Sequence, residues 1–195
     1  MEQAYRRPDD VLTGAPSGPE HEAQVMLASG HLLRVRFLQE GDEEPLRAFF
    51  DGLSPRTRYL RFLSHTPKLP DSVVRILTCV DDRRALALVA VVDTADGGDI
   101  VGLGNLFVVE DCRMEVALVV RDDWQRQRVG TELAHRMLQA AHARGVVRFV
   151  AHVAGDNVAI RGLLHRHGKI ISARMNGSVT EFTFVGRQVL EEATT

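Results

Sequence analysis

The sequence of 195 residues has few of the features that mark secreted, membrane-spanning or metal-dependent proteins. Its two cysteines, Cys79 and Cys112, form no CxxC motif, so neither a disulfide scaffold nor a cysteine-based metal site is expected. No apolar run approaches the ~20 residues that a membrane span needs, and no hydrophobic stretch follows the N-terminal arginines. We therefore expect a cytoplasmic protein without a membrane partner.

An excess of one charge is also missing, because 24 lysines and arginines oppose 26 acidic residues. The net charge of -2 gives no reason to expect a nucleic-acid partner. Neither GxGxxG nor GxxxxGK[ST] occurs, so the sequence does not support a dinucleotide-binding fold or a nucleoside triphosphatase. His135 and His142 share a helical face but have no supporting carboxylate at ligand spacing, and we expect no metal.

What is present is a chain that is 45% apolar, enough for the core of one domain. Residues 1–30 combine several prolines and glycines with polar residues and are expected to form a mobile arm. The folded domain is expected over residues 31–186, and residues 187–195 are expected to be a tail.

Hydrophobic periodicity predicts an α/β domain with a mixed sheet. Alternating or continuous apolar runs predict strands at 31–38, 85–94, 100–111, 112–122, 146–153, 170–175 and 178–185. Helical spacing is found at 42–53, 54–63, 71–80, 129–145 and 156–168. Asp42 and Asp71 are expected to cap two of these helices, and Asn176-Gly177 predicts the last hairpin.

The most informative stretch runs from Glu115 to Leu138. An apolar strand ends at Val120, polar residues follow, and a helix begins close to Val129. This order directs free backbone N–H groups and the positive end of a helix dipole at the space beyond the strand. Arg121, Arg126 and Arg128 add positive charge, so we expect an anion such as a pyrophosphate here.

This stretch resembles the GCN5-related N-acetyltransferases (GNAT). Their signature is Gln or Arg, two residues, Gly, one residue, then Gly or Ala, and Gln125, Arg128 and Gly130 occupy these positions. Arg128 replaces the usual first glycine, which puts a tight phosphate cradle in doubt. Asn157 opens a second helix, as is usual in the family, and the resemblance covers roughly Leu32 to Val185.

Three sequence segments look most like the catalytic domain of bacterial Pat-type protein-lysine acetyltransferases, which modify acyl-CoA synthetases. They are FFDGLSPRTRYLRFLS, MEVALVVRDDWQ and LLHRHGKI. The resemblance implies a mostly antiparallel sheet of about seven strands flanked by helices and splayed between the fourth and fifth strands. It also implies direct transfer of an acetyl group from acetyl-CoA to an amine, such as a protein lysine, in a ternary complex.

The resemblance further assigns residues to the cofactor and to the chemistry. The expected cofactor-binding residues are Leu118, Val119, Val120, Gln125, Arg126, Gln127, Arg128, Val129, Gly130, Thr131 and Asn157. Glu115, an acid within an apolar strand, aligns with the glutamate proposed as base in Pat-type enzymes. Many relatives use a tyrosine in the second helix to protonate the leaving thiolate, but Leu163 and Leu164 stand there.

Other interpretations remain open at this level. Glu115 is equally consistent with a solvent-facing strand residue, and Asn157 with a simple helix cap. Arg56, Arg58, Tyr59 and Arg61 suggest a solvated helix face, with a grip on an acidic protein as the alternative. The chain is therefore interpreted as an acetyl-CoA-dependent N-acetyltransferase. The alternatives are a noncatalytic acyl-CoA sensor and an enzyme for a small-molecule amine.

Overall fold

The computed structural model describes residues 23–78, 85–94, 98–109 and 113–187. The strands are β1 (Ala23–Met26), β2 (Leu32–Phe37), β3 (Ala85–Val92), β4 (Asp99–Val109), β5 (Arg113–Val120), β6 (Arg148–Ala154), β7 (Gly168–Asn176) and β8 (Val179–Gly186). The helices are α1 (Glu43–Asp51), α2 (Pro55–Phe62), α3 (Asp71–Thr78), α4 (Val129–His142) and α5 (Val158–His167). Cys79 and Cys112 lie outside the described residues.

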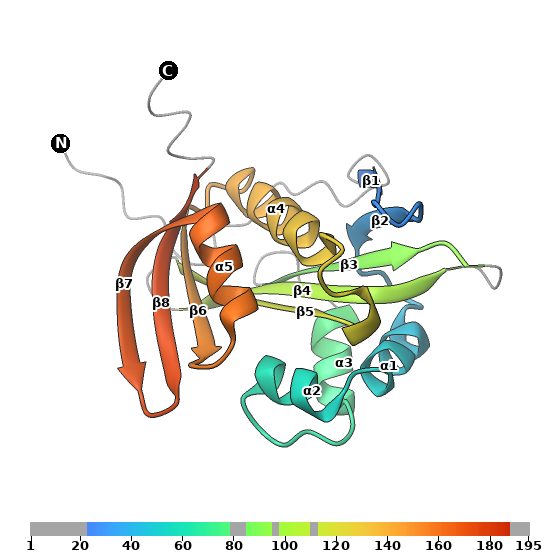
Figure 1. The fold of residues 1–195 in the computed structure, drawn as a ribbon, viewed down its shortest axis with the longest axis horizontal. Coiled ribbons are helices and arrows are strands. Elements are labelled where there is room, and N and C mark those ends of the chain that lie inside the picture. The colour runs from blue at the N-terminus through green and yellow to red at the C-terminus, as the bar shows by residue number, and fades with distance from the viewer. Residues whose placement is uncertain (1–22, 79–84, 95–97, 110–112, 188–195) are drawn as a thin grey trace.

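One eight-stranded sheet organises the fold, in the order β1-β2-β3-β4-β5-β6-β8-β7. All neighbours pair antiparallel except β5 and β6, which are parallel. This confirms the predicted mixed, mostly antiparallel α/β architecture. Figure 1 shows α4 above the sheet and α1, α2 and α3 below it, with β7 and β8 at the edge beside α5.

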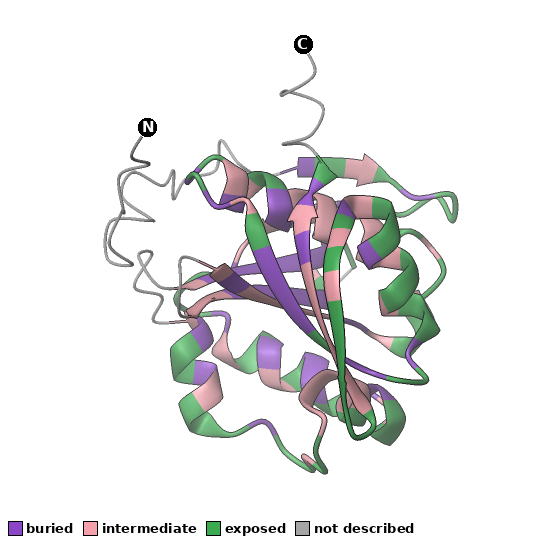
Figure 2. Cartoon of the chain, turned by 90° about the vertical axis from the view of Figure 1, so that its left-hand side faces the viewer, coloured by how far each residue is buried: buried purple, intermediate pink, exposed green. Residues whose placement is uncertain are grey.

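Both faces of the central strands are buried, which explains why their sequences are almost continuously apolar. In β3, Leu86 and Leu88 pack in the core under α4, whereas Ala87 and Val89 pack in a second core with α1 and α3. In Figure 2 the central strands are largely buried and the outer surfaces of the helices are exposed. Period-two alternation thus divides each strand between two apolar layers.

One expectation about the N-terminal part differs from the structure. The eight-stranded sheet includes β1, which pairs with β2 through Ala23↔Val35 and Met26↔Leu32. This strand lies within residues 1–30, so the sheet begins earlier than the expected arm boundary. Its four residues are too few to give a periodic signal, and its position depends on the partner strand.

The two predicted acidic caps also differ. Asp42 precedes α1 but makes no capping bond; its carboxylate instead accepts from Arg36 at 2.6 and 2.8 Å and from the Gln39 amide. Burial opposes ionisation here, but these hydrogen bonds outweigh it and lower the pKa of Asp42. Asp71 is the first residue of α3, and its carboxylate accepts from Arg47 at 2.7 Å. Both acids bind arginines that are brought near by the fold.

We expect Gly104→Ala to lower the free energy of unfolding by about 1–3 kcal/mol, the usual cost of overpacking a filled core. A Cβ at Gly104 would overlap the sulfur of Met137, which is fully buried between β4 and α4. The matched control is Gly162→Ala on α5, where nothing lies within 4 Å of an added Cβ. Helix propensity makes that variant neutral or about 1 kcal/mol more stable in urea unfolding. Equal stabilities of the two variants would contradict this packing.

Candidate active site

The β5–β6 pair, the parallel pair of the described sheet, lies beside the candidate site. The paired residues are Met114 with Phe149 and Glu115 with Val150, at the beginning of each strand. Further along, residues 116–118 of β5 and 151–153 of β6 line an inner cavity of about 70 Å³. The expected splay between two central strands stays a prediction, and this cavity lies where β5 and β6 have no paired residues.

A larger outer cavity of about 380 Å³ adjoins the inner cavity and extends toward the start of α4. Leu60, Arg61, Leu118, Asn157, Ile160 and Leu163 line both cavities. Of the eleven predicted cofactor-binding residues, nine line the outer cavity: Leu118, Val119, Val120, Gln125, Arg126, Arg128, Gly130, Thr131 and Asn157. The size is within the usual range for ligand sites. Their assignment to a cofactor stays a prediction.

The other two predicted cofactor residues do not line either cavity. Val129 is 1% exposed and packs in the core, and the Gln127 side chain donates to the backbone oxygen of Asp123 at 2.9 Å. Arg121 is also directed elsewhere, because it pairs with Asp123 at 2.8 Å. The local positive charge of the loop therefore comes from Arg126 and Arg128, which form no ion pair within the described residues.

The loop before α4 presents backbone N–H groups. In the part of the chain that the structure describes, the amides of residues 126–131 have no hydrogen-bond acceptor, whereas the Gln125 amide donates to Asp122. Arg126 and Arg128 are left-handed, with φ of 62° and 69°. Such residues turn nearby N–H groups toward one side, as in anion-binding nests. Together with the dipole of α4, this arrangement favours a phosphate.

Gln125 and Asn157 both have structural roles at the cavity. The side-chain NH₂ group of Gln125 donates to the backbone oxygen of Val120 at 3.1 Å and so ties the loop to the end of β5. The side-chain oxygen of Asn157 accepts from the Ile160 amide at 3.2 Å and caps α5. Because that oxygen is used, the Asn157 NH₂ group is what remains to donate into the cavity.

Glu115 does not line either cavity and lies one residue before the lining segment. Its carboxylate is 40% exposed and is 3.4 Å from Nδ1 of His152, a residue that lines the inner cavity. A half-buried cation lies close by: Arg61 donates to the side-chain oxygen of Asn105. Burial lowers the pKa of Arg61 to about 10, and Glu115 acts in the opposite direction. Arg61 therefore remains positively charged at neutral pH.

The arginines of α2 form the solvated face that the sequence suggested only in part, since Arg56 is 64% exposed but Arg58 and Arg61 are half-buried. Arg58 donates to three backbone oxygens and stacks on Phe50 at 4.7 Å, and Arg56 pairs with Asp156 at 2.8 Å. Asp122, on the loop after β5, accepts from Ser54 and Thr57 and so holds the start of α2. Sequence reasoning missed Asp122 and Thr57 at the site because their contact joins residues more than 60 positions apart.

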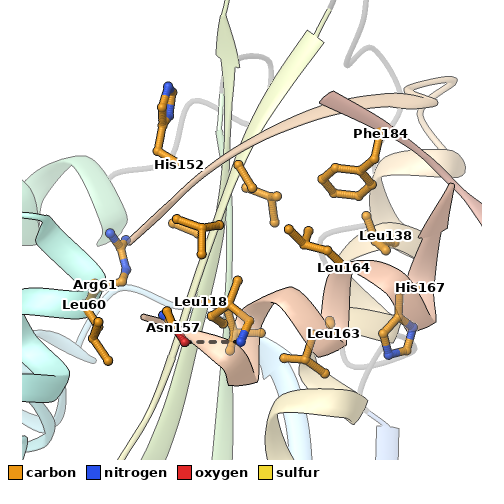
Figure 3. Close-up of a pocket in the computed structure, with 16 residues that line it drawn as sticks. Leu60, Arg61, Leu118, Leu138, His152, Asn157, Leu163, Leu164, His167 and Phe184 are labelled. Atoms are coloured by element: carbon orange, nitrogen blue, oxygen red, sulfur yellow. Dashed lines mark hydrogen bonds between the residues drawn. The ribbon is translucent and has the colours of Figure 1, made fainter. Parts of the chain in front are cut away.

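The inner cavity is largely apolar, as Figure 3 shows for Leu138, Leu164 and Phe184 around it. Leu163 and Leu164 line it where many relatives place a tyrosine; Tyr59 is 42% exposed and lines neither cavity. His167 also lines the inner cavity. Burial, then the charges of His135 and Arg166, lowers the pKa of His167. The described residues include no group of three side chains able to hold a metal, and no helix among them is long and apolar enough to cross a membrane.

Comparison with known proteins agrees with this geometry. A model of the acetyltransferase (GNAT) family matches residues 48–168, which include every predicted site residue. The chain belongs to this family. The resemblance found in the sequence is therefore confirmed, and the GNAT family uses acetyl-CoA.

Individual relatives within the GNAT family are distant. Acetyltransferase PA5475 of Pseudomonas aeruginosa is 28% identical over 140 residues, 70% of this chain and 74% of the relative. The GNAT domain of S. lividans PAT has the same fold, with a TM-score of 0.77 and 24% identity over 87% of this chain and 99% of that domain. A cAMP-binding acyltransferase from Mycobacterium smegmatis is 25% identical, with a TM-score of 0.56 over 84% of this chain and 47% of that one. This GNAT chain thus spans about half of the mycobacterial protein.

Arg128→Gly separates the backbone and charge contributions of the loop. Glycine adopts a φ of 69° without the strain that an arginine has there. We therefore expect the free energy of unfolding of Arg128→Gly to be about 1 kcal/mol higher than that of wild type. Loss of an unpaired cation should weaken binding of coenzyme A about fivefold, which calorimetry measures. Arg128→Ala is the control, because it loses the charge and keeps the strain. Stability that rises equally in both variants would exclude strain at this position.

The contact between Asp122 and α2 predicts an acid-dependent loss of stability. Burial raises the pKa of Asp122, but hydrogen bonds from Ser54 and Thr57 outweigh it, so the pKa lies below 3.8. A carboxyl group whose pKa is lower in the folded than in the unfolded state stabilises the fold at any pH above the unfolded-state pKa. This contribution disappears as the pH falls through the folded-state pKa. We expect Asp122→Asn to lower the free energy of unfolding by about 1 kcal/mol at pH 7 and by less below pH ~4.

Thermal and urea unfolding from pH 7 to pH ~3 measures this difference. Asp123→Asn is the control for Asp122→Asn, because Asp123 bonds Arg121 at an exposed position, where an ion pair contributes little. A difference between wild type and Asp122→Asn that stays constant with pH would contradict the role of the ionised carboxylate.

Proposed function

We propose that the chain transfers an acetyl group from acetyl-CoA to a primary amine, with a protein lysine ahead of a small molecule as acceptor. One observation carries the proposal: the unpaired amides of residues 126–131 border a cavity that continues into the gap between β5 and β6. A pyrophosphate at the amides directs the pantetheine arm toward Leu118 and Asn157. The thioester then lies near Glu115.

The reaction proceeds by direct attack of the neutral amine on the thioester carbonyl. A free lysine has a pKa of ~10.4, so forming the neutral amine at pH 7 costs about 4.6 kcal/mol. Glu115 takes the proton, directly or through a water, as general base. Backbone N–H groups of residues 118–120 pair with the pantetheine arm, and one of them polarises the carbonyl. Water protonates the thiolate, since leucines line the site that other relatives give to tyrosine.

The preference for protein lysine rests on the resemblance to Pat-type enzymes, whose acceptors are acyl-CoA synthetases. An acyl-CoA synthetase is accordingly the first acceptor to test, in the cytoplasm. A noncatalytic acyl-CoA sensor is the second candidate, because Arg128 replaces a glycine of the signature and the tyrosine is missing. Incubation with radiolabelled acetyl-CoA, an acyl-CoA synthetase and a panel of small amines separates them. Binding of acetyl-CoA without transfer to any amine would establish the sensor and exclude the enzyme.

We expect Glu115→Gln to lower kcat by about 10²–10⁴-fold, the usual contribution of a general base. Affinity for acetyl-CoA should stay within about twofold, because Glu115 lies outside both cavities. The control is Glu44→Gln on α1, whose carboxylate is 90% exposed and far from the acetyl site in sequence and fold. Steady-state kinetics with calorimetry measures both quantities. Unchanged kcat in Glu115→Gln would remove Glu115 as the base.

A further inference from the structure

The inner cavity extends into the apolar core beyond the residues that it shares with the outer cavity. Twelve of its sixteen lining residues are apolar, so most of its wall is hydrocarbon. Figure 3 shows Leu138, Leu164 and Phe184 on the side of the cavity away from Arg61. These three side chains are at most 7% exposed, so this end of the cavity, the apolar end, lies inside the protein.

The wall of the apolar end comes from the sheet and from the two helices above it. Ala151 and Val153 of β6 line the cavity and belong to the core that α4 covers. Ala134 of α4 and Leu164 of α5 line it from the helices. Two of these four residues are alanines, whose short side chains leave room. Leu164 adds no hydroxyl at a position near which many relatives have a tyrosine, so the wall stays apolar.

We propose that the apolar end holds the tail of an acyl group longer than acetyl, and that the chain uses propionyl-CoA and butyryl-CoA as donors. The inference rests on the proposed function, in which the pantetheine arm reaches Leu118 and Asn157. Both residues line the outer and the inner cavity, so an acyl chain that begins beside them continues into the inner one. A ligand site lined mainly by apolar side chains with a few polar groups at one side suits a thioester with a hydrocarbon tail.

The volume of the inner cavity sets the length of the tail. An apolar cavity of ~150 Å³ binds benzene, which has six carbon atoms. The inner cavity of about 70 Å³ therefore has room for about three carbon atoms. Beyond the carbonyl carbon, acetyl has one carbon atom, propionyl two, butyryl three and hexanoyl five. Acetyl thus fills the cavity only in part, and hexanoyl exceeds it.

The same wall selects hydrocarbon over charge. Each methylene group that leaves water for an apolar wall strengthens binding. An ionised carboxylate at the apolar end would lose its hydration and find only Leu138, Leu164 and Phe184 beside it. The polar lining residues are Arg61, His152, Asn157 and His167. Arg61 comes from α2, on the other side of the cavity, and already donates to Asn105.

The longer acyl group reacts as acetyl does. The amine nitrogen forms a bond to the acyl carbonyl carbon, and the bond between that carbon and sulfur breaks. Glu115 takes the proton of the amine, and the thiolate of coenzyme A takes a proton from water. The reaction needs no further reactant, so the donors differ only in the tail.

The test compares acetyl-CoA, propionyl-CoA, butyryl-CoA and hexanoyl-CoA, as ligands in calorimetry and as donors to the amine that wild type acetylates. We expect affinity and kcat/KM to rise about two- to fourfold for each methylene group up to butyryl. Both should fall about tenfold or more from butyryl to hexanoyl, because the longer tail overpacks the cavity. Succinyl-CoA has a carboxylate where butyryl-CoA has a methyl group, and it should bind about tenfold or more weakly than butyryl-CoA.

Two substitutions fill the cavity from opposite walls. Ala151→Val adds bulk from β6, and Ala134→Leu adds it from α4 and provides an independent readout should Ala151→Val fold poorly. Each should lower the ratio of kcat/KM for butyryl-CoA to kcat/KM for acetyl-CoA about tenfold or more. The matched control is Ala173→Val, an exposed position of β7 outside both cavities, which should keep the ratio of wild type.

The outcomes separate this inference from the proposed function. Propionyl-CoA and butyryl-CoA that both bind no more tightly than acetyl-CoA would overturn the tail site, whether or not transfer occurs. A ratio that stays at the wild-type value in both Ala151→Val and Ala134→Leu would overturn it as well. A wild type that binds butyryl-CoA more tightly than acetyl-CoA but acylates no amine would support the tail site and overturn the proposed enzyme.

Discussion

The parallel pairing of β5 with β6 is the constraint on which the site depends. Every other neighbouring pair in the sheet is antiparallel, and this pair aligns two residues of each strand before a cavity begins. Parallel neighbours must be joined by a crossover, which here is α4. The crossover starts where β5 ends, so the first amides of α4 necessarily lie beside the gap. The position of the proposed anion site and that of the inner cavity thus follow from one connection.

Much of this arrangement could be predicted from the sequence, because it depends on local patterns. Periodicity located the helices and central strands, and Asn176-Gly177 located the final hairpin between β7 and β8. The strand-to-helix order predicted free amides before α4, and nine of eleven expected cofactor residues line one cavity. Val129 is the instructive exception. Val129 is the first residue of α4 and its side chain is buried in the core, so its position in the motif did not predict where the side chain lies.

The contacts that sequence could not predict join distant segments. Arg61 is an ordinary cation in a helical pattern, but its burial beside Asn105 and Glu115 requires α2 to lie against β4 and β5. The approach of His152 to Glu115 depends on strand register, since a shift of one residue would put His152 on the opposite face. Asp42 likewise bonds Arg36 rather than the helix that follows it. Local capping rules gave no information about such partners.

Helix α2 shows how polar contacts shape one wall of the cavity. Thr57 is its one buried residue, and Phe62 packs partly buried against Phe50. Three polar contacts add to this packing, each with a different element: Asp122 after β5, Asn105 on β4 and Asp156 before α5. Apolar packing is non-directional, whereas hydrogen bonds fix distance and angle. Because Arg56, Thr57 and Arg61 line the outer cavity, these three directional bonds help to fix the position of its wall.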